Sequence, residues 1–409
     1  MISKRNIGRK NMGKNFTFQL IFIFLIRLLL NTGRRFIYPF APVLGRSLDV
    51  PVTAITTIIA TSQFTSLFGL FSGPIADRIG NRVVMRTGLA LLSIGMLLCG
   101  LVPEYLAVFV GLVLASFGKT VFDPAIQSFI GHHVPFTRRG RVIGIIETAW
   151  AGSTLIGIPA FALIIEHMGL RISFYVLAFL GALGWLFIAR ILPPDSKEKG
   201  ASGEKSGLLS GIFSLFRQRE TAGMLLFGFW ISIANDGLFV VYGLWLEESF
   251  DVSLVTLGFS TVAIGSAELI GEGMTALFSD RIGLKKTIII CLCLVSGAYF
   301  ILPLIGVSLI WAMVGIFCVF LFFEMVMVTS FSLSTELLPA SRATMMSGFY
   351  ALSGIGRMIG VLIGGILWGF GGITAVAWAA SCFTLLGLGS LLWGLSNWQH
   401  DGAGGSQGD

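Results

Sequence analysis

Ionisable residues interrupt several long apolar stretches of this sequence. Asp236, Glu268, Glu324 and Arg357 each lie near the middle of such a stretch. A charge near the centre of a bilayer costs several kcal/mol, so each of these residues is a functional candidate by default. The four sum to a charge of −2 if all are ionised. Because burial favours the neutral form of a carboxyl group, we expect at least one of the three to hold a proton, as a proton carrier must.

A second group of charges lies in the first half of the chain. Lys119 and Asp123 stand one helical turn apart and are expected to form a neutralising i,i+4 pair. Arg27 is expected to pair with Asp123 or with Glu147. Paired charges within a membrane also hold helices together, so this group is either structural or part of the same polar site.

Two arginines and a repeated asparagine lie toward the end of the first apolar stretch. Arg34 and Arg35 point about 100° apart on a helix. We therefore expect one guanidinium to face the pathway, where it would bind a carboxylate or phosphate, and the other to extend outward to the head groups. The Asn-x-Gly-x4-Tyr spacing that begins at Asn31 recurs from Asn235, so both asparagines are added to the candidate polar site.

The composition places these charges in a membrane protein. Of the 409 residues, 55% are hydrophobic and 12% are charged, whereas soluble proteins have about 25% charged residues. Twelve apolar runs are long enough to cross the hydrocarbon, for which about 20 residues suffice. The runs cover residues 17–44, 51–73, 83–102, 105–130, 140–166, 171–192, 220–246, 254–277, 286–304, 307–334, 343–369 and 373–396.

The basic residues predict the orientation of the chain in the membrane. Of the 28 Lys and Arg residues, 21 fall before the first run or in alternate connections, and only Arg46 and Arg171 fall in the remaining connections. This bias predicts that both termini lie in the cytoplasm. The net charge of +7 is accordingly a signal of topology and does not indicate a nucleic-acid partner.

The chain repeats itself at about half its length. Asp77-Arg78-Ile79-Gly80 recurs as Asp280-Arg281-Ile282-Gly283, 203 residues later, and the asparagine motif recurs after 204. Such repeats are typical of duplicated membrane transporters. The sequence therefore predicts two pseudo-symmetric six-helix bundles. The predicted divisions are a basic cytoplasmic N-terminus (1–16), a first bundle (17–192), a cytoplasmic linker (193–219), a second bundle (220–398) and a polar tail (399–409).

These features together resemble the major facilitator superfamily of secondary transporters. The family's Gly-x-x-x-Asp-Arg-x-Gly-x-Arg signature matches between the second and third runs, and a degenerate copy follows the eighth. The resemblance implies that Asp77 latches onto the start of the eleventh run near Arg342, and Asp280 onto the start of the fifth near Arg138. The gating residues implied are Gly73, Asp77, Arg78, Gly80, Arg82, Asp280, Arg281, Gly283, Arg138 and Arg342.

Two further family signatures are imperfect in this chain. Proton-linked members often have an arginine four residues before a glycine in the fourth span, and this chain has Leu114 before Gly118. Antiporters have a Gly-Pro pair in a glycine-rich fifth span, and here Pro159 stands one residue further along, after Gly157 and Ile158. The chain looks most like the bacterial drug exporters.

We therefore expect a proton-coupled exporter of amphipathic compounds that works by alternating access in the bacterial inner membrane. Its expected partners are a small-molecule substrate, protons and lipid, and we expect a monomer without cofactor or metal. The alternatives are proton-coupled uptake of a small organic anion through Arg27, Arg34 and Arg357, a lipid-modifying enzyme, and a sensor without flux. The sequence shows no catalytic motif inside an apolar run, which disfavours the enzyme.

Overall fold

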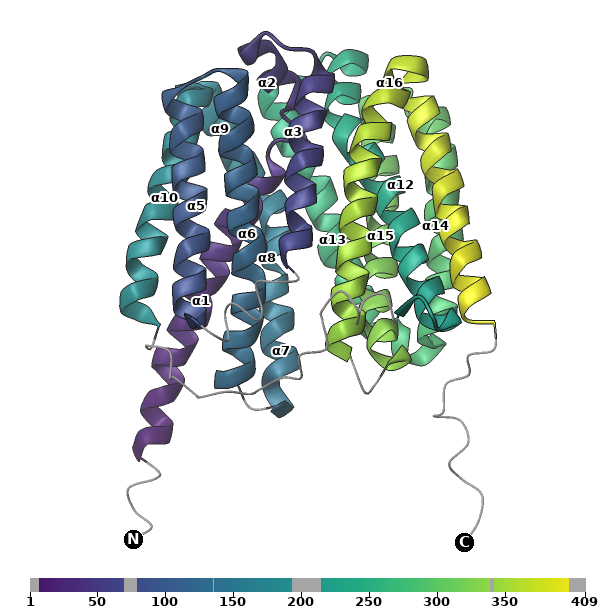
Figure 1. Cartoon of the computed structure of the whole chain (residues 1–409). Coiled ribbons are helices and arrows are strands. Elements are labelled where there is room, and N and C mark those ends of the chain that lie inside the picture. The colour runs from purple at the N-terminus through teal and green to yellow at the C-terminus, as the bar shows by residue number, and fades with distance from the viewer. Residues whose placement is uncertain (1–6, 70–78, 135, 193–214, 339–341, 397–409) are drawn as a thin grey trace, which may run out of the picture.

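A computed structural model describes residues 7–69, 79–134, 136–192, 215–338 and 342–396 of the chain. Every element in these ranges is a helix, which confirms the predicted all-α class (Figure 1). The helices are α1 (Ile7–Arg35), α2 (Ala41–Leu48), α3 (Val52–Phe64), η1 (Thr65–Phe68), α5 (Asn81–Leu101), α6 (Tyr105–His133), α7 (Phe136–Glu147), α8 (Ala149–Gly152), η2 (Ser153–Gly157), α9 (Ile158–Met168), α10 (Leu170–Ile191), α12 (Arg219–Phe250), α13 (Leu254–Ile282), α14 (Leu284–Ile305), α15 (Leu309–Leu337) and α16 (Arg342–Gly394).

The described helices are those of a multi-pass membrane protein. Ten are long and apolar enough to cross a membrane, or eleven if α2 and α3, which meet at 118°, form one broken span. The last of the ten, α16, has 53 residues and is broken at Gly371 and Gly372, where Gly372 has a φ of 57°. Because about 20 residues suffice for one crossing, α16 crosses twice. With α2 and α3 counted as one broken span and α16 as two crossings, the described helices suffice for the twelve predicted crossings.

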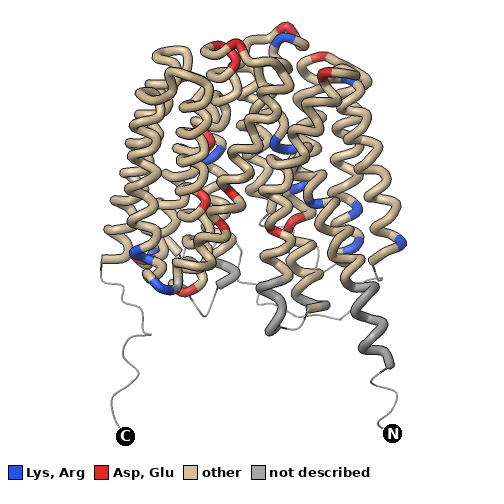
Figure 2. The backbone as a smooth tube through the Cα atoms, turned by 180° about the vertical axis from the view of Figure 1, so that it is seen from behind, with Lys and Arg blue, Asp and Glu red and all other residues tan. Residues whose placement is uncertain are grey.

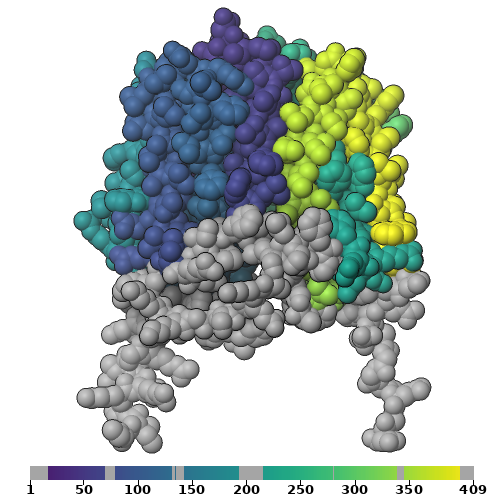
Figure 3. Space-filling view, in the orientation of Figure 1, coloured from purple at the N-terminus to yellow at the C-terminus, as the bar shows by residue number. Residues whose placement is uncertain are grey.

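The helices form two bundles that stand side by side. Figure 1 shows the elements up to α10 in one bundle and those from α12 to α16 in the other. The start of α1 and the end of α16 lie at one end of the molecule, called the terminal end here, whereas α2 and the break in α16 lie at the opposite, far end. The bundles meet where α3 and η1 contact α16 and where α8, η2 and α9 contact α13. Figure 3 shows the α3 and α16 surfaces in contact.

The first predicted span, residues 17–44, is broken in the structure. α1 ends at Arg35, a turn follows, and α2 begins at Ala41. Pro39 lies in the turn and Pro42 in the first turn of α2. Proline has no backbone N–H and cannot continue a helix, so the break follows from these two residues. The break places Arg35 at the end of a helix, where its side chain can reach the neighbouring bundle.

The fifth span is also irregular. The π-helix η2 interrupts it, and the backbone N–H of Ile158 bonds to the carbonyl of Ser153, five residues earlier. Pro159 follows directly and offers no N–H to the preceding turn, which favours the wider helix at this point. The irregular turn is the element that carries Thr154 into the interface between the bundles.

Glycines set the closest approach between helices within each bundle. A Cβ atom at Gly364 of α16 would lie 2.3 Å from the carbonyl oxygen of Gly237 of α12, and one at Gly95 of α5 would lie 2.2 Å from that of Gly111 of α6. Such contacts leave no room for a side chain. They hold the helices together where lipid supplies no hydrophobic force between them.

Candidate functional site

Figure 2 shows that the chain positions of the charged residues inside the molecule lie between the far end and the terminal end. Glu268 of α13 is among the most enclosed of these residues. Its Oε1 accepts hydrogen bonds from Nη2 of Arg35 at 2.6 Å and from Nε1 of Trp150 at 3.1 Å. Its Oε2 accepts from Nη1 of Arg35 at 3.3 Å and from Oγ1 of Thr154 at 2.9 Å. We call Arg35, Trp150, Thr154 and Glu268 the Glu268 cluster.

The Glu268 cluster joins the two bundles. Arg35, Trp150 and Thr154 come from α1, α8 and η2 of the first bundle, whereas Glu268 comes from α13 of the second. The side chains of Arg35 and Glu268 are each 3% exposed. The Arg35 guanidinium also lies over the Trp150 ring, 4.1 Å from its centroid. Arg35 and Trp150 can only donate, and the guanidinium favours an ionised carboxylate. The Thr154 hydroxyl also lies 2.9 Å from the carbonyl oxygen of Ala151, so toward Glu268 it can either donate or accept.

Local packing brings α13 close enough for these bonds. Gly265 lies one turn before Glu268, and a Cβ atom there would lie 2.6 Å from Oγ1 of Thr154. Thr261, one turn earlier, donates a hydrogen bond to the carbonyl oxygen of Thr154 at 2.8 Å. The small residue and the threonine therefore fix the distance between α13 and η2.

A second polar connection between the bundles runs through Tyr38, in the turn after α1. Its hydroxyl donates to Oδ1 of Asp236 on α12 at 3.1 Å and accepts from Nε2 of Gln63. Oε1 of Gln63 in turn accepts from the Arg34 guanidinium. On the other side of Asp236, Nε of Arg357 on α16 lies 3.9 Å from Oδ2. We call these five residues the Asp236 cluster.

The third charged group stays within the first bundle. Arg27 lies 2.6 Å from Oε2 of Glu147 and 3.4 Å from Oδ1 of Asp123, and Lys119 pairs with Asp123. The structure therefore confirms the predicted i,i+4 pair and the predicted partners of Arg27. Two cations and two carboxylates balance in this group, which fits a role in holding α1, α6 and α7 together.

Glu324 of α15 and Glu272 of α13 differ from the other intramembrane carboxyl groups. Neither makes an ion pair or hydrogen bond with another residue in the described part of the chain. Glu324 lies within electrostatic range of Glu268, Glu272, Arg35 and Arg357. Glu324 packs on Gly271 of α13: a Cβ atom added at Gly271 would lie 3.1 Å from the Cβ atom of Glu324. A carboxyl group without a cation partner, close to an ion pair, is suited to gain and lose a proton.

Two side chains beside this polar region are partly exposed. Tyr350 of α16 is 48% exposed, although it lies within electrostatic range of Arg27 and Glu147 of the first bundle. The Glu147 side chain is itself 40% exposed. At the far end, in contrast, the two bundles contact each other. A Cβ atom at Gly243 of α12 would lie 2.5 Å from the carbonyl oxygen of Pro39.

Several predicted residues are placed differently from the sequence expectation. The expectation that one of Arg34 and Arg35 extends outward to the head groups is wrong, because both guanidiniums bond to other residues inside the molecule. The helix ends at Arg35, so the two side chains reach different partners without one of them leaving the interior. Asn31 and Asn235 are buried, and among the described residues neither amide atom of Asn31 has a hydrogen-bond partner.

Five residues of the two inter-bundle clusters are absent from the predicted site: Arg35, Tyr38, Gln63, Trp150 and Thr154. For Arg35 the sequence left open whether it or Arg34 faces the pathway. A signal was present for one pair only. Trp150 and Thr154 stand one turn apart beside the irregular turn before Pro159, and π-helical turns are frequent at functional sites.

The charged turn and its copy are only partly described. Gly73, Asp77 and Arg78 lie outside the described residues, as do the side chains of Asp280, Arg138 and Arg342. Gly80 and Gly283, which precede α5 and α14, have φ values of 100° and 93°. A positive φ favours glycine, and this accounts for the repeated glycine of the signature. The latch contacts stay a prediction.

Comparison with known proteins identifies the fold and the relatives. The sequence model of the Major Facilitator Superfamily matches residues 23–350 and 224–400. The uncharacterised MFS-type transporter YceJ of Bacillus subtilis (strain 168) is 24% identical over 303 residues, which are 74% of this chain and 77% of that protein. The multidrug resistance protein MdtG of Salmonella typhimurium is 25% identical over 261 residues, 61% of this chain and 62% of that protein.

Solved structures show the same architecture. A bacterial homologue of the human lysosomal transporter Spinster, inward-facing and unoccupied, has a TM-score of 0.70 at 17% identity and covers 93% of this chain and 96% of its own. A POT family transporter in complex with a thioalcohol-conjugated peptide has a TM-score of 0.75 at 16% identity and covers 92% of this chain and 96% of its own. At these identities the likeness supports the fold alone.

Proposed function

Because the chain belongs to the major facilitator superfamily, whose members are transporters, we propose that it exports amphipathic compounds in exchange for protons. In this proposal the two bundles rock about the mid-depth polar clusters and open alternately toward either side. The terminal end faces the cytoplasm of a bacterial inner membrane, the far end faces outward, and the protein works as a monomer.

The observation that carries the proposal is the ion pair of Glu268 with Arg35, a residue of the opposite bundle. The guanidinium favours an ionised carboxylate. A proton on Glu268 would remove its charge and so weaken the only buried ion pair between the bundles among the described residues. Contact between the bundles is thereby linked to loss of a proton, which is the coupling that a proton-driven transporter needs.

Glu324 is the proposed partner of Glu268 in moving the proton. It lies within electrostatic range of Glu268 and has no cation of its own in the described chain. When Glu268 pairs with Arg35, the proton it has lost can pass to Glu324 through water, since no hydrogen bond joins the two carboxyl groups in the structure. In this proposal the proton leaves Glu324 for the terminal side when the bundles open there.

Exchange follows if the transported compound competes with that proton. A compound whose polar or cationic group contacts Glu324 favours the ionised carboxylate and so expels the proton. The likeness to MdtG, a multidrug resistance protein, supports export of such compounds. The antiporter signature adds no further support, because Ile158 separates Gly157 from Pro159. The case for export therefore rests on the relatives and on the carboxyl groups.

A second function is favoured by a different observation. Arg34 donates to Gln63, and no carboxylate of a described residue pairs with it, while Arg357 lies nearby and only 3.9 Å from Asp236. An organic anion between the two guanidiniums would favour proton binding by the neighbouring carboxyl groups. Anion and proton would then travel together, so this candidate is proton-coupled uptake of a small organic anion.

The direction of proton movement separates the two candidates. The purified protein is reconstituted into liposomes that contain a pH-sensitive dye, and ethidium or naphthalene-2-sulfonate is added on one side. If the protein exchanges compound for protons, protons should cross the membrane in the direction opposite to ethidium. If it cotransports an anion with protons, protons should cross in the same direction as naphthalene-2-sulfonate.

Variants at the two carboxyl groups test the carrier role. Glu268→Gln and Glu324→Gln are expected to abolish compound-driven proton movement. Glu248→Gln, which removes an exposed carboxylate at the far end, is the matched control and should move protons like the wild type. Unchanged proton movement in both carrier variants would rule out the assignment.

The charged turn is proposed to act as the gate on the cytoplasmic side. Replacement of Asp77 by asparagine keeps the shape of the side chain and removes its charge. We expect normal membrane insertion and strongly reduced transport, because a carboxylate near a helix N-terminus gains about 0.3 to 1 kcal/mol and more beside an arginine. Wild-type flux in this variant would contradict the latch.

A further inference from the structure

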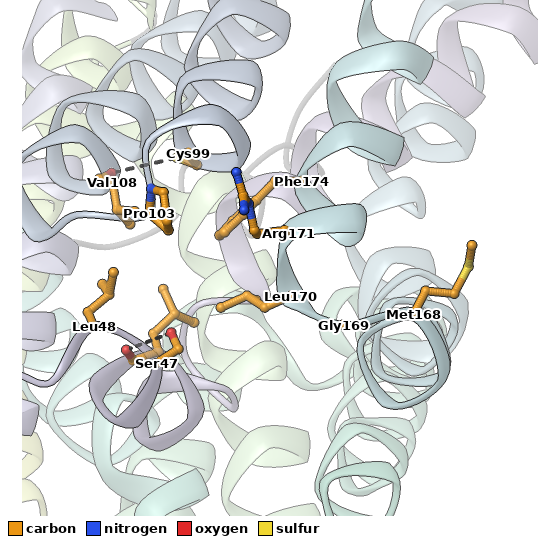
Figure 4. A pocket seen from close by; sticks show the side chains of 11 residues that line it. Ser47, Leu48, Cys99, Pro103, Val108, Met168, Gly169, Leu170, Arg171 and Phe174 are labelled. Atoms are coloured by element: carbon orange, nitrogen blue, oxygen red, sulfur yellow. Dashed lines mark hydrogen bonds between the residues drawn. The ribbon is translucent and has the colours of Figure 1, made fainter.

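A cavity of about 420 Å³ lies at the far end of the first bundle, away from the charged clusters. It is bounded by α2, by the connection between α5 and α6, and by the turn between α9 and α10 (Figure 4). Its floor is apolar and buried, since Leu44, Cys99, Val108 and Phe174 are each at most 2% exposed. A cavity of this size and lining is within the range of small-molecule sites.

One charged residue stands at the rim of the cavity. Arg171 is the only ionisable residue with a formal charge among the lining residues. Its Nε donates to the carbonyl oxygen of Gly100 at 3.0 Å, and its Nη2 donates to that of Leu101 at 3.4 Å. These bonds fix the guanidinium beside the end of α5. A guanidinium has five N–H donors, so three are left to bind an anionic group.

The surroundings of the rim are apolar and exposed. Leu101 is 57% exposed, Leu106 70%, Met168 55% and Ile172 38%. In a chain that crosses a membrane, such residues face lipid. The cavity therefore opens where a lipid chain and its head group are both at hand, with an apolar floor for the chain and Arg171 for the head group.

We propose that this cavity binds an anionic phospholipid of the outward-facing leaflet. One acyl chain lies against Leu48, Met168 and Leu170, the apolar lining residues that are partly or largely exposed, and the phosphate binds Arg171. Charge complementarity and continuity with the lipid-facing residues identify a phospholipid as the occupant.

The lipid would also influence the contact between the bundles. Leu44, Ser47 and Leu48 of the cavity wall belong to α2. The same short helix carries Arg46, which lies 2.6 Å from Oε1 of Glu247 on α12 of the other bundle. A chain that fills the space behind α2 holds the helix toward α12. Occupancy thus stabilises the state in which the far end is closed.

The direct test is binding of defined lipids to the purified full-length protein in detergent. Phosphatidylglycerol is compared with phosphatidylcholine, which has the same phosphate but no net charge, by the shift in melting temperature over a lipid titration. We expect phosphatidylglycerol to bind at least tenfold more tightly. Arg171→Gln should remove this preference, whereas Arg190→Gln, which removes an exposed arginine at the other end of α10, should retain it.

A second variant keeps the test valid if Arg171→Gln destabilises the protein without lipid. Leu48→Phe fills part of the cavity and leaves Arg171 in place, so it should weaken binding of both lipids. Equal affinity of the wild type for the two lipids would overturn the proposal. So would a preference for phosphatidylglycerol that survives in Arg171→Gln, or lipid binding that is unchanged in Leu48→Phe.

The effect on the far end is measured with spin labels on Thr53→Cys of α3 and Ser249→Cys of α12. Phosphatidylglycerol should increase the population with the short distance in the wild type and not in Arg171→Gln. An equal increase in both would contradict the role proposed for α2. None of these measurements depends on transport, so the lipid site can fail while the transport proposal stands, and the reverse.

Discussion

Replacement of Arg35 by methionine is the most informative single change in the Glu268 cluster. Methionine has a similar length and no charge, so it removes the cation while the interface stays filled. The Glu268 carboxylate, whose side chain is 3% exposed, would then have only Trp150 and Thr154 as donors. We expect the state with a closed far end to lose stability, because a buried charge without its counter-ion is costly.

The size of the effect follows from the contacts that are lost. Two charge-assisted hydrogen bonds, each contributing about 1.5 to 3 kcal/mol, join Arg35 and Glu268. Removal of one partner of a buried ion pair costs about 3 to 5 kcal/mol. At about 1.4 kcal/mol for each factor of ten, the ratio of closed to open far ends should fall by a factor of roughly 10² to 10³ or more.

The double variant Arg35→Met/Glu268→Met provides the internal comparison. Replacement of both members of a buried ion pair by apolar residues is often neutral or stabilising. We therefore expect the double variant to close its far end more completely than Arg35→Met alone. The coupling energy between the two positions, taken from the four proteins of the cycle, should be several kcal/mol, at the upper end of the roughly 0.5 to 3 kcal/mol seen for contacting residues.

The assay is the distance between spin labels on Thr53→Cys and Ser249→Cys, with the exposed Cys293 and Cys382 and the partly exposed Cys318 replaced by alanine. The wild type should give mainly the short distance and Arg35→Met mainly the long one.

The matched control for the charge is Arg190→Gln. Arg190 is exposed at the terminal end of α10, away from the contacts between the bundles, so this variant should change the distances little. A folded Arg35→Met protein with the wild-type distance distribution would refute the reasoning.

Three further predictions concern packing and the other polar clusters. Gly364→Ala places a Cβ atom 2.3 Å from an α12 carbonyl oxygen and should lower the free energy of unfolding by about 1 to 3 kcal/mol, seen as a lower melting temperature. The control is Gly389→Ala, which has open space around it and should leave the melting temperature unchanged. Arg27→Met leaves two carboxylates with one cation, so the folded yield in detergent should fall even though the inter-bundle contacts are intact. Tyr38→Phe removes the hydroxyl that bonds to Asp236 and should shift the far end toward the open state by roughly tenfold, seen in the same label distances; an unchanged distribution would assign Tyr38 to packing alone.

The sequence predicts which charged residues are costly to place in the membrane better than it predicts which residues they contact. Asp236, Glu268 and Arg357 were found because the cost of a charge in a bilayer depends on one residue and its depth in the run. The i,i+4 pair of Lys119 and Asp123 was found because helical geometry fixes it. These inferences need no knowledge of tertiary structure.

The contacts between the bundles could not be predicted in the same way. Arg35 and Glu268 are 233 residues apart, and periodicity does not show which of two adjacent arginines reaches the other bundle. The choice depends on the end of α1 at Arg35, which follows from the prolines at 39 and 42. The position of Thr154 likewise depends on the irregular turn Ser153–Gly157. In the sequence, Pro159 is the only sign of that turn.

The most direct test of the account is the pH dependence of the spin-label distance across the far end. In the proposed mechanism the Arg35–Glu268 ion pair stabilises the closed far end, so acidification that protonates Glu268 should move the population from the short to the long distance. In Glu268→Gln the carboxylate is absent, and the long distance should prevail at every pH. A wild type that stays closed on acidification, or a Glu268→Gln protein that opens and closes with pH as the wild type does, would contradict the claim that this carboxylate links the proton to the movement of the bundles.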